Sequence, residues 1–80
     1  MEMLKSAAKK AVGTKEVLRA LKANEAVCVF VASDIDTFLY QKVTRACAEA
    51  GIPVQKVDSA KELGRVCALT IGCAAAAVCK

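Results

Sequence analysis

The chain contains no histidine, and none of its five cysteines is spaced as a C-x-x-C pair. Histidine is the most common general base near neutral pH, so acid–base chemistry and histidine-assisted thiol chemistry have no candidate here. A structural zinc site needs four convergent ligands, and these cysteines lack the paired spacing of such sites. We therefore expect no catalytic residue, no bound metal and no cofactor.

The sequence also lacks a membrane-spanning run and a secretory leader. Its most apolar stretch, residues 66–79, is fourteen residues long, which is shorter than the ~20 needed to cross a bilayer. The first twelve residues carry Lys5, Lys9 and Lys10 with no apolar run after them, unlike a signal peptide. An odd number of cysteines in apolar surroundings argues against a disulfide framework. We expect a cytoplasmic protein without membrane contact, whose reduced thiols fill the core.

Small apolar residues dominate what is present. The 80 residues are 56% apolar, 25% charged and only 4% aromatic. This composition is typical of one globular domain, spanning residues 1–80, with an aliphatic core in which alanines allow helices to approach a sheet closely. The net charge of +4 is compatible with a nucleic-acid partner but does not require one.

Segments with helical periodicity alternate with short apolar runs, which predicts an α/β domain with helices on both faces of a sheet. Helices are expected over residues 2–10, 14–22, 36–51 and 59–67. Strands are expected over residues 26–32, 54–57 and 74–79, with a short strand or turn at 12–13 and a loop at 68–73. The alternating order predicts a three-layer α/β/α sandwich.

Local signals mark the ends of these helices. Thr14 is expected to cap the second helix, and Asp36, with Asp34 as its rival, the third. Gly51 is suited to end the third helix in a left-handed conformation. Ser59 begins a capping box with the glutamate three residues later. The predicted core stripe of the third helix is Leu39, Val43, Ala46, Cys47 and Ala50.

The segment that follows Gly13 places charge on one face of a helix. Lys15, Glu16, Arg19 and Lys22 are three or four residues apart or adjoining, so they point the same way. An exposed helix N-terminus offers free N–H groups to a phosphate, and an acceptor among cations can read a nucleobase edge. The same pattern is also normal for an amphipathic helix with a solvated outer face.

Several motifs occur in an order that is typical of one family. They are GTKE at 13–16, VASD at 31–34, GIPV at 51–54, LG at 63–64 and LTIGCAAAAV at 69–78. Together they resemble the kink-turn RNA-binding ribosomal-protein family, which includes archaeal ribosomal protein L-seven-Ae. In length the chain is similar to the short bacterial YbxF-type members.

The resemblance implies an α/β/α sandwich with a mixed four-stranded sheet and a non-catalytic role in binding kink-turns. A kink-turn is an RNA bulge followed by tandem sheared G·A pairs. The resemblance implies that Gly13 lets the backbone approach RNA closely and that Thr14 faces a phosphate. Lys15 and Arg19 would approach guanine acceptor edges, while Glu16 would accept a hydrogen bond from a guanine amino group.

Two further contacts are expected. Lys22 would bind RNA irrespective of its sequence. The loop near the end of the chain would pack against the bases of the bulge, although its apolar side chains could instead seal the end of the sheet. The residues of this second contact are Leu69, Thr70, Ile71, Gly72 and Cys73.

The expected partner is a structured RNA that contains a kink-turn, in ribosomal RNA, a riboswitch or another RNA. The ribosome is a candidate partner, and the protein is expected to be a monomer. An alternative is a family member that has lost specific RNA binding and acts as a ribosome-associated or protein-interaction subunit. A steep dependence of binding on salt would favour RNA, and a shallow one a protein partner. A thiol enzyme has no support beyond the number of cysteines.

Overall fold

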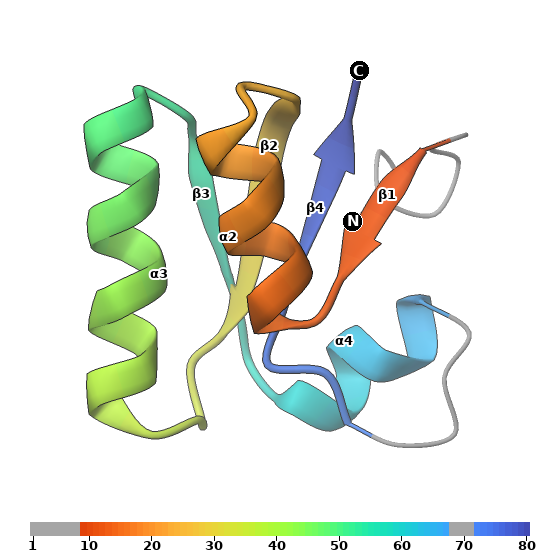
Figure 1. Cartoon of the computed structure of the whole chain (residues 1–80). Coiled ribbons are helices and arrows are strands. Elements are labelled where there is room, and N and C mark those ends of the chain that lie inside the picture. The colour runs from red at the N-terminus through yellow and green to blue at the C-terminus, as the bar shows by residue number, and fades with distance from the viewer. Residues whose placement is uncertain (1–8, 68–71) are drawn as a thin grey trace.

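The computed structural model describes residues 9–67 and 72–80 of the chain. Figure 1 shows the elements in this part of the protein, labelled in chain order. They are β1 (Lys10–Val12), α2 (Thr14–Lys22), β2 (Ala26–Ala32), α3 (Thr37–Ala50), β3 (Val54–Val57), α4 (Ala60–Val66) and β4 (Ala75–Cys79). The first predicted helix lies mostly outside the described residues, and its predicted end is wrong because Lys10 begins a strand.

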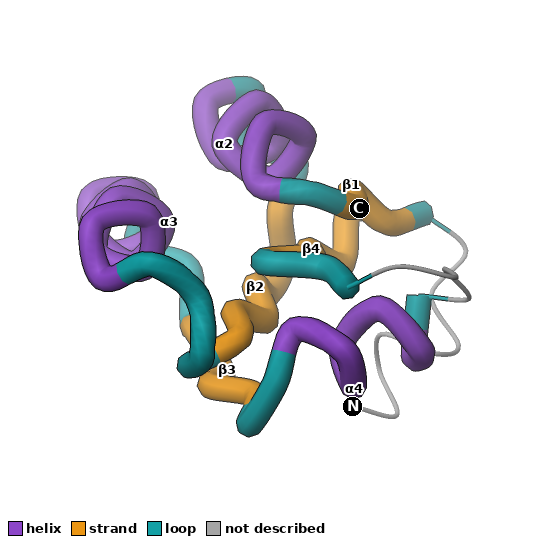
Figure 2. Tube along the Cα trace, turned by 90° about the horizontal axis from the view of Figure 1, so that it is seen from below, coloured by secondary structure: helices purple, strands orange, loops and turns teal. Residues whose placement is uncertain are grey.

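The four strands form one mixed sheet in the order β1-β4-β2-β3. β2 pairs parallel with β3 and antiparallel with β4, and β4 pairs antiparallel with β1. Figure 2 shows α2 and α3 on one face of this sheet and α4 on the other. The predicted three-layer sandwich with a mixed four-stranded sheet is therefore confirmed.

Alternation along β2 divides the core between the two faces of the sheet. Val29 and Val31 pack with the cluster under α2 and α3, whereas Cys28 and Phe30 pack with the cluster under α4. Because successive side chains of a strand point to opposite faces, a continuous apolar run is what a strand covered on both sides requires. Val27 is the exception at 41% exposed, and the pairing with β4 shifts register between Ala26 and Cys28.

The helix ends follow most of the predicted caps. The Asp36 carboxylate accepts hydrogen bonds from the N–H groups of Phe38 and Leu39 at 2.8 and 3.3 Å. Asp34, its predicted rival, instead accepts from the N–H of Ala60 at 2.8 Å and so ties the end of β2 to the start of α4. Gly51 ends α3 with φ of 69°, as predicted.

The start of α4 and the stripe of α3 show one confirmation and one correction. Ser59 Oγ accepts from the N–H of Glu62 at 3.1 Å, as the predicted capping box requires. Val43 and Cys47 are fully buried in the core. Ala50 is exposed, so its assignment to the core stripe is wrong, because it lies in the last turn of α3.

The cysteines fill the core, as predicted. Cys28, Cys47, Cys67 and Cys73 are buried free thiols, and Cys79 is half-buried. Burial raises the pKa of the Cys47 thiol to about 11, with a smaller contribution from the nearby Cys28. Burial likewise raises the pKa of Cys28 and of Cys67. These thiols stay protonated near neutral pH and are poor nucleophiles.

Candidate nucleic-acid interface

The start of α2 is built on Gly13. Its backbone angles are φ 97° and ψ 152°, a region that is essentially restricted to glycine. Its N–H donates to the Ala75 carbonyl at 2.8 Å, and its own carbonyl accepts from the N–H of Val17 at 3.0 Å. Gly13 is therefore the N-cap. The predicted capping role of Thr14 is wrong, because Thr14 is already the first residue of the helix.

No side chain caps α2 within the described part of the chain. The first N–H groups of a helix have no partner inside the helix, so those of Thr14, Lys15 and Glu16 depend on an outside acceptor. These groups and the partial positive charge at the helix end favour an anion. The start of α2 thus offers hydrogen-bond donors to an anionic ligand.

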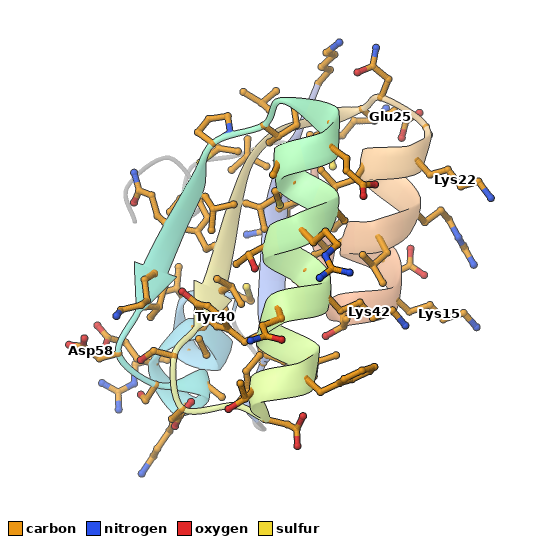
Figure 3. All side chains as sticks on the ribbon, turned by 90° about the vertical axis from the view of Figure 1, so that its left-hand side faces the viewer. Lys15, Lys22, Glu25, Tyr40, Lys42 and Asp58 are labelled. Carbon is orange, nitrogen blue, oxygen red and sulfur yellow. The ribbon has the colours of Figure 1, made fainter. Side chains whose placement is uncertain are left out.

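The outer face of α2 carries the predicted set of charges. Lys15, Glu16, Arg19 and Lys22 are all exposed. Val17 and Leu21, on the opposite side of the helix, are buried against the sheet. In Figure 3, Lys15 and Lys22 project from α2 away from the body of the protein. The structure therefore brings three cations and one carboxylate together on a single accessible face.

Glu16 and Arg19 form an ion pair on this face. Arg19 Nη1 lies 3.5 Å from Glu16 Oε1, and the two side chains are 67% and 50% exposed, respectively. Ion pairs that are this accessible to water contribute little to stability. The pair holds the acceptor and the planar donor next to each other while leaving both accessible to a ligand.

The second predicted contact is only partly within the described residues. Leu69, Thr70 and Ile71 lie outside them, and Gly72 is exposed. The prediction for Cys73 needs correcting, because its side chain is only 3% exposed and belongs to the core under α4. Its thiol donates to the Ala75 carbonyl at 3.0 Å, so it is not available to pack against a base.

Hydrogen bonds hold the start of α2 and the described residues before β4 at one end of the sheet. The bond from Gly13 to the carbonyl of Ala75 joins the start of α2 to the start of β4. The N–H of Cys73 donates to the carbonyl of Ala60 at 2.9 Å, which joins the segment before β4 to α4. Figure 1 shows the start of α2 and the segment leading into β4 at the same end of the molecule.

Sequence reasoning missed two cations beside this face. Lys9 and Lys10 line a hollow of about 200 Å³ together with Glu16, Arg19 and Glu25. Lys10 lies on β1, opposite Val78 of β4. Two adjacent lysines are a sequence signal for such a contact. The predicted helix over residues 2–10 gives no reason to place them beside α2, however.

The described residues meet the requirements of neither a metal site nor a membrane-spanning helix. Residues 9–67 and 72–80 contain no group of three or more histidine, cysteine or acidic residues that could hold a metal ion. Among the described helices, none is both long enough and apolar enough to cross a membrane.

Comparisons with known proteins show which proteins this chain is similar to. A family model described as the ribosomal protein L7Ae/L30e/S12e/Gadd45 family matches residues 1–80. "RNA-binding protein YbxF" of Geobacillus stearothermophilus is 48% identical over 77 residues, which cover 96% of this chain and 94% of that protein. "RNA-binding protein GK0100" of Geobacillus kaustophilus is 47% identical over the same shares. Among solved structures, the "Giardia lamblia 15.5kD RNA binding protein" matches with a TM-score of 0.86 and 25% identity, covering 98% of this chain and 68% of that one.

Proposed function

The chain belongs to the ribosomal protein L7Ae/L30e/S12e/Gadd45 family, and from this premise we propose that it is a non-catalytic RNA-binding protein that recognises kink-turns. The observation that carries the proposal is the start of α2. There a helix start without a side-chain cap lies next to an exposed face that holds Lys15, Glu16 and Arg19.

Each group on this face has a role that suits an RNA with exposed guanines. Lys15 and Arg19 donate to the O6 and N7 acceptors of guanine, and Glu16 accepts from the guanine amino group. The N–H groups that follow Gly13 donate to a phosphate. A face with several donors and one acceptor can recognise a guanine edge. A uniformly positive face would instead bind phosphates without regard to the bases.

An irregular RNA fits α2 better than a regular helix does. The major groove of A-form RNA is too narrow for side chains to read, so proteins recognise RNA mainly at bulges, loops and unusual pairs. Tandem sheared G·A pairs next to a bulge widen the groove and expose guanine edges. We therefore place the start of α2 in that groove.

Cations around this face supply the contacts that do not depend on sequence. Lys22 lies one turn beyond Arg19, and Lys9 and Lys10 line the hollow that Glu16 and Arg19 share. Each phosphate that a cation neutralises releases a counterion and steepens the dependence of affinity on salt.

By family likeness, Leu69, Thr70, Ile71 and Gly72 pack against the bases of the bulge.

The natural target in this proposal is a structured RNA of the cytoplasm, in the ribosome or in another ribonucleoprotein, bound by a monomer. The test is a calorimetric titration of the protein with a short kink-turn RNA at several salt concentrations. A control RNA has its sheared G·A pairs replaced by Watson–Crick pairs. Tight binding of the first RNA and weak binding of the second is the expected result. Equal affinity for both would reduce the interaction to nonspecific electrostatics, and no binding at moderate salt would refute the proposal.

A further inference from the structure

A groove of about 380 Å³ runs between α2 and α3, beside the proposed RNA-binding face. Leu18 of α2 and Ala46 of α3 form part of its wall, and Phe38, Lys42 and Arg45 of α3 line it as well. A second hollow of about 300 Å³ continues the groove past Leu18 to Lys22. Figure 3 shows Lys42 on the side of α3 that faces α2, at the level of Lys15.

Phe38 is the most exposed large apolar side chain among the described residues, at 77%. It lies in the first turn of α3, where its N–H is held by Asp36 at 2.8 Å, so its backbone position is fixed while its ring remains accessible. A single exposed apolar residue needs no explanation by itself. What distinguishes Phe38 is its position at a groove that also carries cations.

Lys42 and Arg45 follow Phe38 by four and seven residues, so the three side chains lie along one face of α3. Both cations are exposed, and in the described part of the chain neither takes part in an ion pair. Glu49 is the acidic residue of the groove, and it lies eleven residues from Phe38, or roughly 16 Å along the helix. Two cations thus lie within two turns of the exposed ring, whose own turn also carries the capping carboxylate of Asp36.

We propose that this groove binds an unpaired nucleotide of the same RNA, with its base stacked on Phe38 and its phosphate held by Lys42 and Arg45. An aromatic ring combined with cations is the arrangement by which proteins bind single-stranded nucleic acid. Leu18 lies between Lys15 and Lys22 on α2, at three and four residues' distance. The groove is therefore continuous with the proposed interface.

The proposal rests on the proposed function, and it names RNA rather than a protein or a second copy as the occupant. A second copy would bring the same cations against Lys42 and Arg45. The carboxylates of an acidic peptide would pair with the cations, but they have no flat apolar surface that could stack on the aromatic ring. A nucleotide matches both the ring and the charges.

The test uses the absence of tryptophan from the chain. A Phe38→Trp variant preserves an aromatic ring and supplies a single fluorescent reporter in the groove. It is titrated with a blunt-ended kink-turn RNA and with four versions that carry an unpaired extension at each strand end in turn. We expect at least one extension to quench the tryptophan. Because base stacking on an aromatic residue is worth ~1–3 kcal/mol, that extension raises affinity roughly 5- to 150-fold.

Phe38→Ala should abolish this gain and leave affinity for the blunt RNA within about twofold of the original. Val27→Ala is the matched control, because Val27 is the second exposed large apolar residue among those described and it does not line the groove. The proposal is overturned if no extension raises affinity, if Phe38→Ala preserves the gain, or if polyglutamate quenches the tryptophan as well as the extended RNA does. Failure of every RNA to bind would instead refute the proposed function.

Discussion

Replacing Gly13 with alanine should destabilise the fold through the backbone alone. At φ 97° and ψ 152° the residue occupies a region that L-amino acids rarely adopt. A Cβ built on Gly13 meets no atom within 4 Å, so no clash contributes. Strain of this kind costs about 1–3 kcal/mol. The lower entropy of the unfolded alanine chain offsets about 0.4–1 kcal/mol of that loss.

The measurement is urea unfolding of the original protein and of Gly13→Ala. We expect a net loss of about 1 kcal/mol, which for a domain of this size lowers Tm by roughly 4–8 °C. Gly72→Ala is the matched control, because a Cβ there would lie 3.4 Å from the Ala60 Cβ in ordinary contact. A loss below ~0.5 kcal/mol at Gly13, or an equal loss at Gly72, would refute the argument from backbone strain.

A D-alanine at position 13 separates this structural role from a role in binding. The D-residue tolerates positive φ, so a synthetic chain with D-Ala should recover most of the stability that L-Ala loses. If RNA also approaches Gly13 closely, the added methyl group will still weaken binding of the kink-turn RNA. Recovery of both stability and affinity would mean that Gly13 is needed for the turn and not for contact with RNA.

Three further outcomes are expected. Glu16→Gln should weaken binding of kink-turn RNA by ~1–3 kcal/mol and reduce the difference in affinity between that RNA and the Watson–Crick control. Lys22→Met should weaken binding of both RNAs alike and reduce the salt slope by about 1. Equal losses from the two variants on both RNAs would contradict this difference. Asp36→Ala removes the cap of α3 and should reduce stability by about 1 kcal/mol in a thermal melt; an unchanged melt would show that the two capping bonds contribute nothing. Because the pKa of Cys47 rises to about 11 in the fold, this thiol ionises first in the unfolded chain, so the free energy of unfolding should fall as the pH rises from about 9 to about 11. A Cys47→Ser chain should show a flatter profile, and an unchanged profile would contradict the shift.

Much of the fold follows from the sequence because its signals are local. The run at residues 26–32 is continuously apolar, and a strand buried on both faces needs such a run. Asp36 and Gly51 have the chemistry that helix ends require, and they bound α3 in the structure. These features depend on near neighbours in the chain, so the pattern alone is sufficient to predict them.

The errors occur where distant segments decide the outcome. Lys10 was assigned to a helix by local periodicity, but pairing with Val78 of β4 makes it part of a strand. Thr14 has the chemistry of a cap, yet the hydrogen bond from Gly13 to Ala75 moves the helix start one residue earlier. Cys73 is the last residue of the predicted loop, but it is buried because it packs against residues of α4. No pattern within a short window contains these pairings.

The candidate site shows the same division. The charged face of α2 follows from helical spacing, so Lys15, Glu16 and Arg19 could be placed together from the sequence. The positions of Lys9 and Lys10 beside that face, and of Phe38 beside Leu18, depend on how the strands and helices pack. The sequence therefore predicts the charges that lie together on α2, but it does not predict which side chains pack beside them.

The central claim is that Glu16 on α2 reads a guanine of the sheared pairs. A double-mutant cycle tests it most directly, with affinities measured for the original protein and Glu16→Gln against kink-turn RNA and against RNA with inosine at each sheared guanine. Inosine lacks the amino group, and the cycle removes any effect that both proteins share. We predict a coupling energy of at least ~1 kcal/mol at one guanine, because either change alone already breaks the same contact. Additive effects at both guanines would contradict the account.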